Sequence, residues 1–198
     1  MDLRERIVLA SASPRRRSLL MEAGLRFDVL PADVDESLAD GVEAEPAAVE
    51  LGERKARAVA ERLAGHERWV LGADTIVAVG ETILGKPSDE RDAERMLRLL
   101  SGSRHRVVTG VCIVRTGDGA LVSGFERTFV TMRPLTDEEV AGYVASGEWR
   151  DKAGGYAIQE TADRFVTRLE EGGFDNVVGL PVSLSLQLLR ELEAPLPA

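Results

Sequence analysis

The order of strand-like and helix-like segments constrains the fold of this chain most strongly. In the first half, short apolar segments alternate with helix-like segments. In the second half, two long apolar segments are joined by Thr-Gly-Asp-Gly at 116–119, which is a typical hairpin turn. Strands that alternate with helices pair in parallel, and the strands of a hairpin pair antiparallel. We therefore predict an α/β fold in which a mixed sheet carries flanking helices.

Capping residues set the predicted helix ends. Ser13 and Ser88 are good N-cap residues, Thr136 and Glu139 form a capping box, and Gly24 suits a helix end. The predicted helices are 13–23, 46–64, 88–100, 136–146 and 181–192. The predicted strands are 6–11, 27–32, 69–79, a short strand ending at 85–87, 104–116, 120–133, 164–169 and 174–178.

Three arginines crowd the first turn of the helix predicted at 13–23. Pro14 suits the first helical position, and Arg15, Arg16 and Arg17 follow it directly. This end of a helix already carries partial positive charge and unpaired N–H groups, so cations there are unfavourable. A bound anion such as a phosphate removes the conflict. The alternative is that all three side chains point into water.

Composition limits the kind of protein that this chain can be. Its 198 residues suit one α/β domain or two small lobes, and we expect a single domain over 1–198. The net charge of −9 argues against a general nucleic-acid binder. No apolar run approaches the ~20 residues that span a bilayer, and no secretory signal is expected. The single Cys112 fits a reducing cytoplasm and lies in an apolar run, which favours a core position.

Acidic side chains occur in two settings. Asp74 lies inside the apolar segment 69–79, where an unpaired carboxylate is costly, so we predict a metal ligand or a general base, with the Thr75 hydroxyl beside it. The alternative is a strand end at which Asp74 caps a turn. Asp35 and Glu36 lie in the acidic, loop-like segment 33–45. Paired acids near phosphates suit Mg²⁺, but sequence alone favours a solvated loop here.

The three lysines and one glutamine are further candidates. Lys86 stands between a glycine and a proline in a turn, which favours a phosphate contact, whereas Lys55 lies in a predicted helix where local ion pairs are the simpler reading. Lys152 and Gln159 flank two glycines at 154–155, which would let the backbone approach a ligand closely. The alternative is a flexible surface loop.

Other common sites have no support. His66 and His105 are isolated, with no second ligand at metal spacing, and we leave both out. The sequence has no P-loop and no Gly-x-Gly-x-x-Gly motif, which disfavours common NTPase and dinucleotide folds.

Taken together, these segments resemble the Maf family of nucleoside triphosphate pyrophosphatases. The resemblance runs in order along almost the whole chain. The matching segments are Leu-Ala-Ser-Ala-Ser-Pro-Arg-Arg at 9–16, Glu-Arg-Lys-Ala at 53–56, Gly-Ala-Asp-Thr at 72–75, Gly-Lys-Pro at 85–87, Lys-Ala-Gly-Gly-Tyr-Ala-Ile-Gln at 152–159 and Val-Gly-Leu-Pro at 178–181.

This resemblance implies a fold and an activity. The fold is of the inosine-triphosphate-pyrophosphatase type, with two lobes around a cleft, and the protein is expected to be a cytoplasmic homodimer. The activity is hydrolysis of a nucleoside triphosphate to the monophosphate and pyrophosphate, with a divalent metal, Mg²⁺ or Mn²⁺. Neither a nucleic acid nor a membrane is expected as a partner.

The resemblance also assigns roles by position. Asp74 would be the general base and a metal ligand, and Glu36 the second metal ligand. The triphosphate would be held by Ser11, Ser13, Arg15, Arg16, Lys55 and Lys86, and Lys152 is a further candidate. Arg15, Thr75 and Gln159 match positions that look like specificity determinants of the branch acting on dTTP and UTP, whereas the branch acting on 7-methyl-GTP typically has Trp after the proline. Arg17 lies outside the matching segment and is expected in water.

Two alternatives stay open at this point. One is a non-catalytic regulator that binds a division partner, since the family is associated with septum formation. The other is a nucleotidyltransferase-like enzyme that passes the nucleotide to a second substrate.

Overall fold

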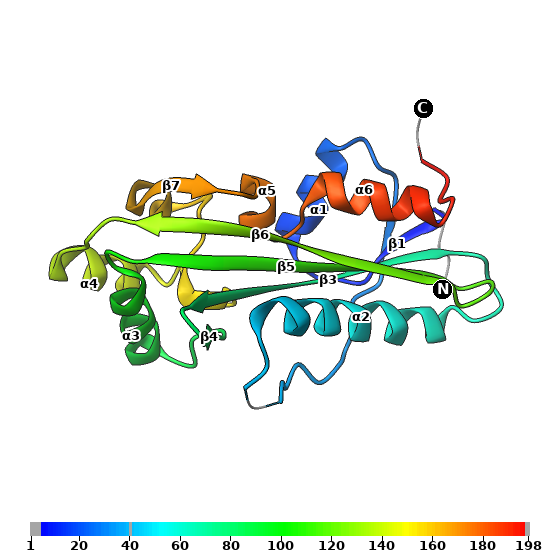
Figure 1. Ribbon diagram of the computed structural model, residues 1–198. Coiled ribbons are helices and arrows are strands. Elements are labelled where there is room, and N and C mark those ends of the chain that lie inside the picture. The colour runs from blue at the N-terminus through cyan, green and yellow to red at the C-terminus, as the bar shows by residue number, and fades with distance from the viewer. Residues whose placement is uncertain (1–4, 40, 197–198) are drawn as a thin grey trace.

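The computed structural model describes residues 5–39 and 41–196, and these form one seven-stranded sheet with helices on both faces (Figure 1). The strand order is β2-β1-β3-β5-β6-β7, and β4 pairs with β3. The strands are β1 (Ile7–Leu9), β2 (Asp28–Val29), β3 (Trp69–Val79), β4 (Thr82–Leu84), β5 (Arg104–Arg115), β6 (Leu121–Met132) and β7 (Val166–Glu170). The α-helices are α1 (Pro14–Glu22), α2 (Ala44–Arg62), α3 (Glu90–Leu100), α4 (Asp137–Ser146), α5 (Phe174–Val178) and α6 (Val182–Glu191), with 3-10 turns η1 (Ala153–Gly155) and η2 (Thr161–Phe165).

The pairing confirms the predicted mixed sheet. β1 runs parallel to both β2 and β3, and the remaining pairs are antiparallel. β5 follows one edge of β3 from Trp69 to Ala78. The other edge of β3 is shared, because β1 pairs with 69–71 and β4 pairs with 77–79. Within the described chain, no strand pairs with this edge between 72 and 76, and this opening is the place where the site forms.

The helices form two lobes along the long strands β3, β5 and β6 (Figure 1). At the β1 end, α2 covers one face of the sheet, and α1 and α6 cover the other. At the far end, α3 and α4 pack with β4 and the 3-10 turns around a core that includes Leu97, Tyr143 and Phe165.

Close approach of α2 to the sheet depends on glycines. A Cβ at Gly72 would lie 2.3 Å from the carbonyl oxygen of Gly52 and 2.6 Å from the amide nitrogen of Ala56. A Cβ at Gly110 on β5 would lie 2.2 Å from the backbone of Ala48. Because these contacts are to helix backbone, no side-chain rotation relieves them, and α2 lies as deep as it does only with glycine in the strands.

Most predicted helix ends are confirmed. The Ser13 hydroxyl accepts the amide of Arg16, Pro14 is the first residue of α1, and Gly24 follows its end with φ +76°. Thr136 and Glu139 form the predicted capping box of α4. Cys112 is fully buried in the core, as predicted, and burial raises the pKa of its thiol to about 12.

Two local predictions are wrong. Asp89 rather than Ser88 caps α3, because its carboxylate accepts the amide of Asp92. Residues 174–178 form helix α5 rather than a strand. Their apolar residues suggested a strand, but the amides of Gly179 and Leu180 both bond back to the carbonyl of Asp175, which closes a helical turn. The acidic segment 33–45 is mostly loop before α2, and its Asp40 lies outside the described residues.

One further observation concerns membranes. Among the described helices, none combines the length and the apolar character that crossing a bilayer requires.

The glycine contact gives a stability prediction. We expect Gly72→Ala to lower the free energy of unfolding by about 3 kcal/mol, because α2 must move away from the sheet to admit the methyl group. Urea unfolding measures this. Gly142→Ala is the matched control, since Gly142 lies in α4 with open space around it and should be neutral or slightly stabilising. Equal stability of both variants would show that the close approach is not tight.

Candidate active site

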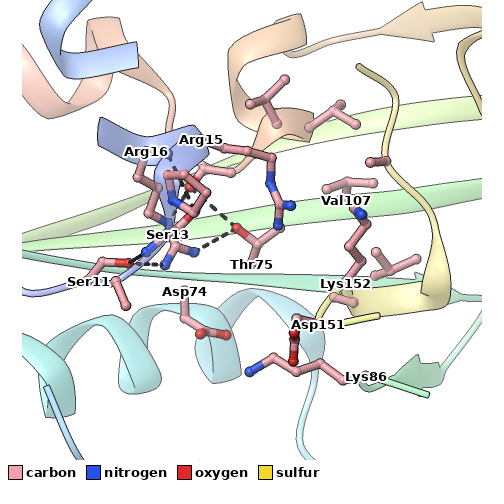
Figure 2. Close-up of a pocket in the computed structure, with 18 of the residues that line it drawn as sticks. Ser11, Ser13, Arg15, Arg16, Asp74, Thr75, Lys86, Val107, Asp151 and Lys152 are labelled. Carbon is pink, nitrogen blue, oxygen red and sulfur yellow. Dashed lines mark hydrogen bonds between the residues drawn. The ribbon is translucent and has the colours of Figure 1, made fainter. Parts of the chain in front are cut away.

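A cavity of about 450 Å³ lies at the opening in the edge of β3, between the two lobes (Figure 2). Its walls come from the turn before α1, from β3, from α2, from the turn after β4 and from the glycine-rich segment. Every residue that the sequence placed in a site lines this cavity: Ser11, Ser13, Arg15, Arg16, Glu36, Lys55, Asp74, Thr75, Lys86, Lys152 and Gln159. Residues from positions 11 to 159 therefore meet in one place.

Asp74 and Thr75 reach the same cavity from opposite faces of the sheet. Neighbouring residues of a strand point to opposite faces. Asp74 points toward α2, where it meets Lys55, and Thr75 points toward α1 and the end of α5, where it meets Arg16. Both line the cavity because neither β1 nor β4 covers the edge of β3 beside them. Asp74 thus lies in the middle of a strand, and the alternative that it ends one is wrong.

A chain of ion pairs occupies the α2 side of the cavity. Lys55 Nζ lies 2.5 Å from Asp74 Oδ1 and 2.6 Å from Glu36 Oε1. Lys86 Nζ lies 3.2 Å from Glu36 Oε2. The Lys55 side chain is only 10% exposed, so it does not lie on a solvated helix face with local pairs. The packing of Gly52 on the sheet, one helical turn earlier, places Lys55 beside Asp74.

The lysines control the charge of Glu36. Burial opposes its ionisation, but hydrogen bonds and positive charge from Lys55 and Lys86 outweigh burial, so the pKa of Glu36 lies below its usual value. Glu36 is therefore an anion at neutral pH. Asp35 does not join it, because the Asp35 carboxylate accepts the amide and the hydroxyl of Ser37 outside the cavity. The two neighbouring acids thus do not act as a pair.

Arg16 organises the other side of the cavity. Its Nε donates to the carbonyl of Gly179 at 2.8 Å, and its two terminal nitrogens donate to Ser11 Oγ at 3.2 Å and Thr75 Oγ1 at 3.1 Å. The residue is only 9% exposed, and burial lowers its pKa although Asp74 opposes the shift. Arg16 ties the turn before α1 to β3 and to the end of α5 (Figure 2).

The other two arginines differ from Arg16 and from each other. Arg15 is partly buried and lines the cavity. Its side chain extends away from α1 into the cavity (Figure 2). Arg17 is exposed and does not line the cavity, which confirms the solvent position expected for it. The first turn of α1 thus presents two cations to the same cavity: Arg15, and Arg16, which is anchored by three hydrogen bonds.

The glycine-rich segment packs tightly on its own chain and also lines the cavity. Gly154 and Gly155 both have positive φ, and a Cβ on either would lie 2.9 Å from Val77 or Pro87. These glycines let the segment pack closely on β3 and on the turn after β4. The Lys152 ammonium is bound by the Glu148 carbonyl and lies 3.1 Å from Glu160 Oε2. Gln159 is exposed at the cavity wall.

Sequence reasoning missed several wall residues. Asp151 lines the cavity with φ +59°, and Tyr156 is buried in the wall with its hydroxyl 2.8 Å from His105 Nε2. His105 itself does not line the cavity, and burial lowers its pKa to about 4. The only sequence signal for Tyr156 was its place in a matching segment, and nothing marked Asp151.

The donor set suits a hard divalent cation. Carboxylate oxygens of Glu36 and Asp74 converge on one ammonium, within 2.6 Å of Lys55 Nζ. Mg²⁺ is usually held by one or two carboxylates together with substrate phosphates, so two acids are sufficient. Among residues 5–39 and 41–196, no group of three or more acidic, histidine or cysteine side chains could hold a metal by itself.

Comparison with known proteins finds one family and relatives that share one name. The family model described as "Maf-like protein" matches residues 6–192. A dTTP/UTP pyrophosphatase of Geobacter sp. (strain M21) is 50% identical, over 95% of this chain and 96% of that protein. A dTTP/UTP pyrophosphatase of Anaeromyxobacter dehalogenans is 46% identical, over 97% and 96%. One of Deinococcus radiodurans is 47% identical, over 93% and 92%.

The ion-pair chain gives a prediction about Glu36. We expect Lys55→Met to raise the pKa of Glu36, and Lys86→Met to raise it less, because Lys55 is closer and more buried. Carbon-13 NMR titration of the glutamate carboxyl measures both. Arg57→Met is the control, since Arg57 lies on the same helix and pairs with Glu53. An unchanged pKa of Glu36 in Lys55→Met would contradict the ion pair.

Proposed function

The chain belongs to the Maf family, and we propose that it hydrolyses dTTP and UTP to the monophosphate and pyrophosphate. Modified pyrimidine nucleotides are further substrates of the proposed reaction, which would clear them from the nucleotide pool. The family match over residues 6–192 and the names of three relatives at 46–50% identity support this proposal.

One observation carries the proposal most directly. A carboxylate, Asp74, stands at the opening in β3 with cationic groups on both sides of the same strand. Arg15 and Arg16 lie on one side, and Lys55 and Lys86 lie on the other. A triphosphate carries several negative charges along its length, and cations on two sides match an anion that crosses the strand edge.

The residues divide the chemistry between them. Asp74 is the proposed general base: Lys55 holds Oδ1, and in the described residues Oδ2 has no hydrogen-bond partner, so Oδ2 is the atom that takes the proton of an attacking water. The water adds to the α-phosphorus, and the bond to the bridging oxygen breaks. Arg15, Arg16 and the lysines stabilise the negative charge that develops on the departing pyrophosphate.

A divalent cation belongs to this proposal. Glu36 and Asp74 would hold Mg²⁺ or Mn²⁺ together with phosphate oxygens, since their oxygens already converge on one positive group. When bound, the ion would neutralise phosphate charge and polarise the phosphoryl group.

Selectivity and setting complete the proposal. Arg15, Thr75 and Gln159 all line the cavity, which supports their role in choosing the nucleotide. Lys152 lines it too, and we propose a supporting role in substrate binding. The net charge of −9 favours a small nucleotide over a nucleic acid. We further propose that the protein works in the cytoplasm, away from membranes, as a homodimer.

The base assignment is tested by a single substitution. We expect Asp74→Asn to lower the rate of pyrophosphate release from dTTP by at least ~100-fold, because an amide cannot accept the proton. Monophosphate and pyrophosphate are measured without any added acceptor, which also separates hydrolysis from nucleotidyl transfer. Asp35→Asn is the control, since Asp35 lies outside the cavity, and near-normal circular dichroism shows that both variants fold. Full turnover by Asp74→Asn would refute this role.

The metal role is tested by titration. We expect chelation with EDTA to stop turnover, and Glu36→Gln to raise the Mn²⁺ concentration at half-maximal rate by at least about tenfold. Asp35→Asn again serves as the control and should leave the metal requirement unchanged. If the wild-type rate persists in EDTA, the proposed metal site is wrong.

A further inference from the structure

Two threonines lie directly opposite each other beneath the cavity wall. Thr75 on β3 pairs with Thr109 on β5, and their hydroxyl oxygens are 3.0 Å apart. Thr75 lines the cavity, whereas Thr109 is fully buried and does not line it. The Thr109 hydroxyl donates to the backbone carbonyl of Asn176 at 3.0 Å. A cross-strand pair of this kind connects a cavity residue to the interior.

The number of hydroxyl protons fixes the direction of these bonds. Each threonine has one proton to donate. Since the Thr109 hydroxyl donates its one hydrogen bond to the carbonyl of Asn176, the short contact between the threonines requires Thr75 to donate to Thr109. Among the described residues, the one other acceptor within hydrogen-bond distance of the Thr75 hydroxyl is the carbonyl of Gly179 at 3.4 Å, which already accepts from Arg16. Whether the Thr75 hydroxyl donates to Thr109 or to Gly179, its proton points into the protein and not toward a ligand.

On its cavity side, the Thr75 hydroxyl oxygen is therefore a hydrogen-bond acceptor, and Arg16 donates to it. Arg16 donates to Thr75 at 3.1 Å, to Ser11 and to Gly179, which takes three of its five N–H groups. The remaining N–H groups are those left for an anion. The direction in which they point depends on the three anchors, and the Thr75 anchor depends on Thr109.

The inner end of this chain of bonds is rigidly held. Asn176 is fully buried, and its Nδ2 donates to the carbonyl of Val107 at 3.1 Å and to Thr128 Oγ1 at 2.8 Å. Thr128 in turn donates to the carbonyl of Gly173. Asn176 thus ties α5 to β5 and β6. The Asn176 carbonyl, which accepts the hydrogen bond from Thr109, therefore has little freedom to move.

We propose that Thr109 is a positioning residue for the proposed pyrophosphatase reaction. Because Thr109 accepts the hydrogen bond that the Thr75 hydroxyl donates, Thr75 is left as an acceptor that orients Arg16 toward the triphosphate. Thr75 then affects catalysis and substrate choice through Arg16 rather than by donating a hydrogen bond to the nucleotide. This inference rests on the proposed function and adds a residue outside the cavity to it.

Substitution of Thr109 tests the inference. We expect Thr109→Val to lower kcat/KM for dTTP about tenfold, and Thr75→Val to lower it at least as much, since each removes one bond that orients a charged group. Thr109→Ser keeps the hydroxyl and should restore most of the activity. In the Thr75→Val background, adding Thr109→Val should change kcat/KM by less than about twofold, because the link is already broken.

A matched control separates positioning from general loosening of α5. Thr128→Val makes the same change at another fully buried threonine, which supports Asn176 without touching Thr75, and we expect a clearly smaller loss of kcat/KM than in Thr109→Val. Three results would overturn the inference: wild-type kcat/KM in Thr109→Val, an equal loss in Thr128→Val, or an undiminished effect of Thr109→Val in the Thr75→Val background.

A measurement on the wild-type protein tests the inference even if the variants fail to fold. NMR of the wild-type protein should show the Thr75 hydroxyl proton in slow exchange with water and close to the Thr109 side chain. A rapidly exchanging proton would overturn the inference. Because this measurement needs no substrate, it still decides the hydrogen-bond direction if the wild-type protein releases no pyrophosphate and the proposed function fails.

Discussion

The interrupted pairing along one edge of β3 is the constraint on which the site depends. β1 ends opposite Leu71 and β4 begins to pair at Val77, so in the part of the chain that the structure describes, the stretch of β3 between these positions is paired on one side only. In a fully paired sheet, Asp74 and Thr75 would face two separate compartments. Here the edge is open, and residues from both faces reach one cavity. A ligand can therefore be bound from both sides of a single strand.

The two sides of this strand are prepared in different ways. On the α2 side, ion pairs dominate: the lysines and carboxylates neutralise one another, and an arriving anion would compete for the lysines. On the α1 side, Arg16 is fixed by three hydrogen bonds and by burial. Fixed donors cost little reorganisation during a reaction, and exchangeable charges accommodate a substrate that changes its charge distribution.

Much of this architecture could be predicted from local patterns. The long strands follow from periodicity, and the helix caps at Ser13 and Thr136 follow from capping chemistry. The residues that line the cavity follow from the matching segments. Helix α5 could not be predicted, since its apolar residues suit a strand and its conformation depends on backbone bonds to Asp175 and on tertiary anchors. Thr109 carries no sequence signal either, because its role arises only from the register of β3 and β5.

In the proposed complex, one triphosphate crosses the open edge of β3 and contacts both sides of the strand. A crystal structure of the Asp74→Asn variant with dUTP whose α and β phosphorus atoms are bridged by nitrogen tests it most directly. We expect phosphate oxygens bound by Arg15 or Arg16 on one side and by Lys55 or Lys86 on the other, with the α-phosphorus nearest residue 74. A triphosphate confined to one side of the strand would contradict binding across the edge of β3.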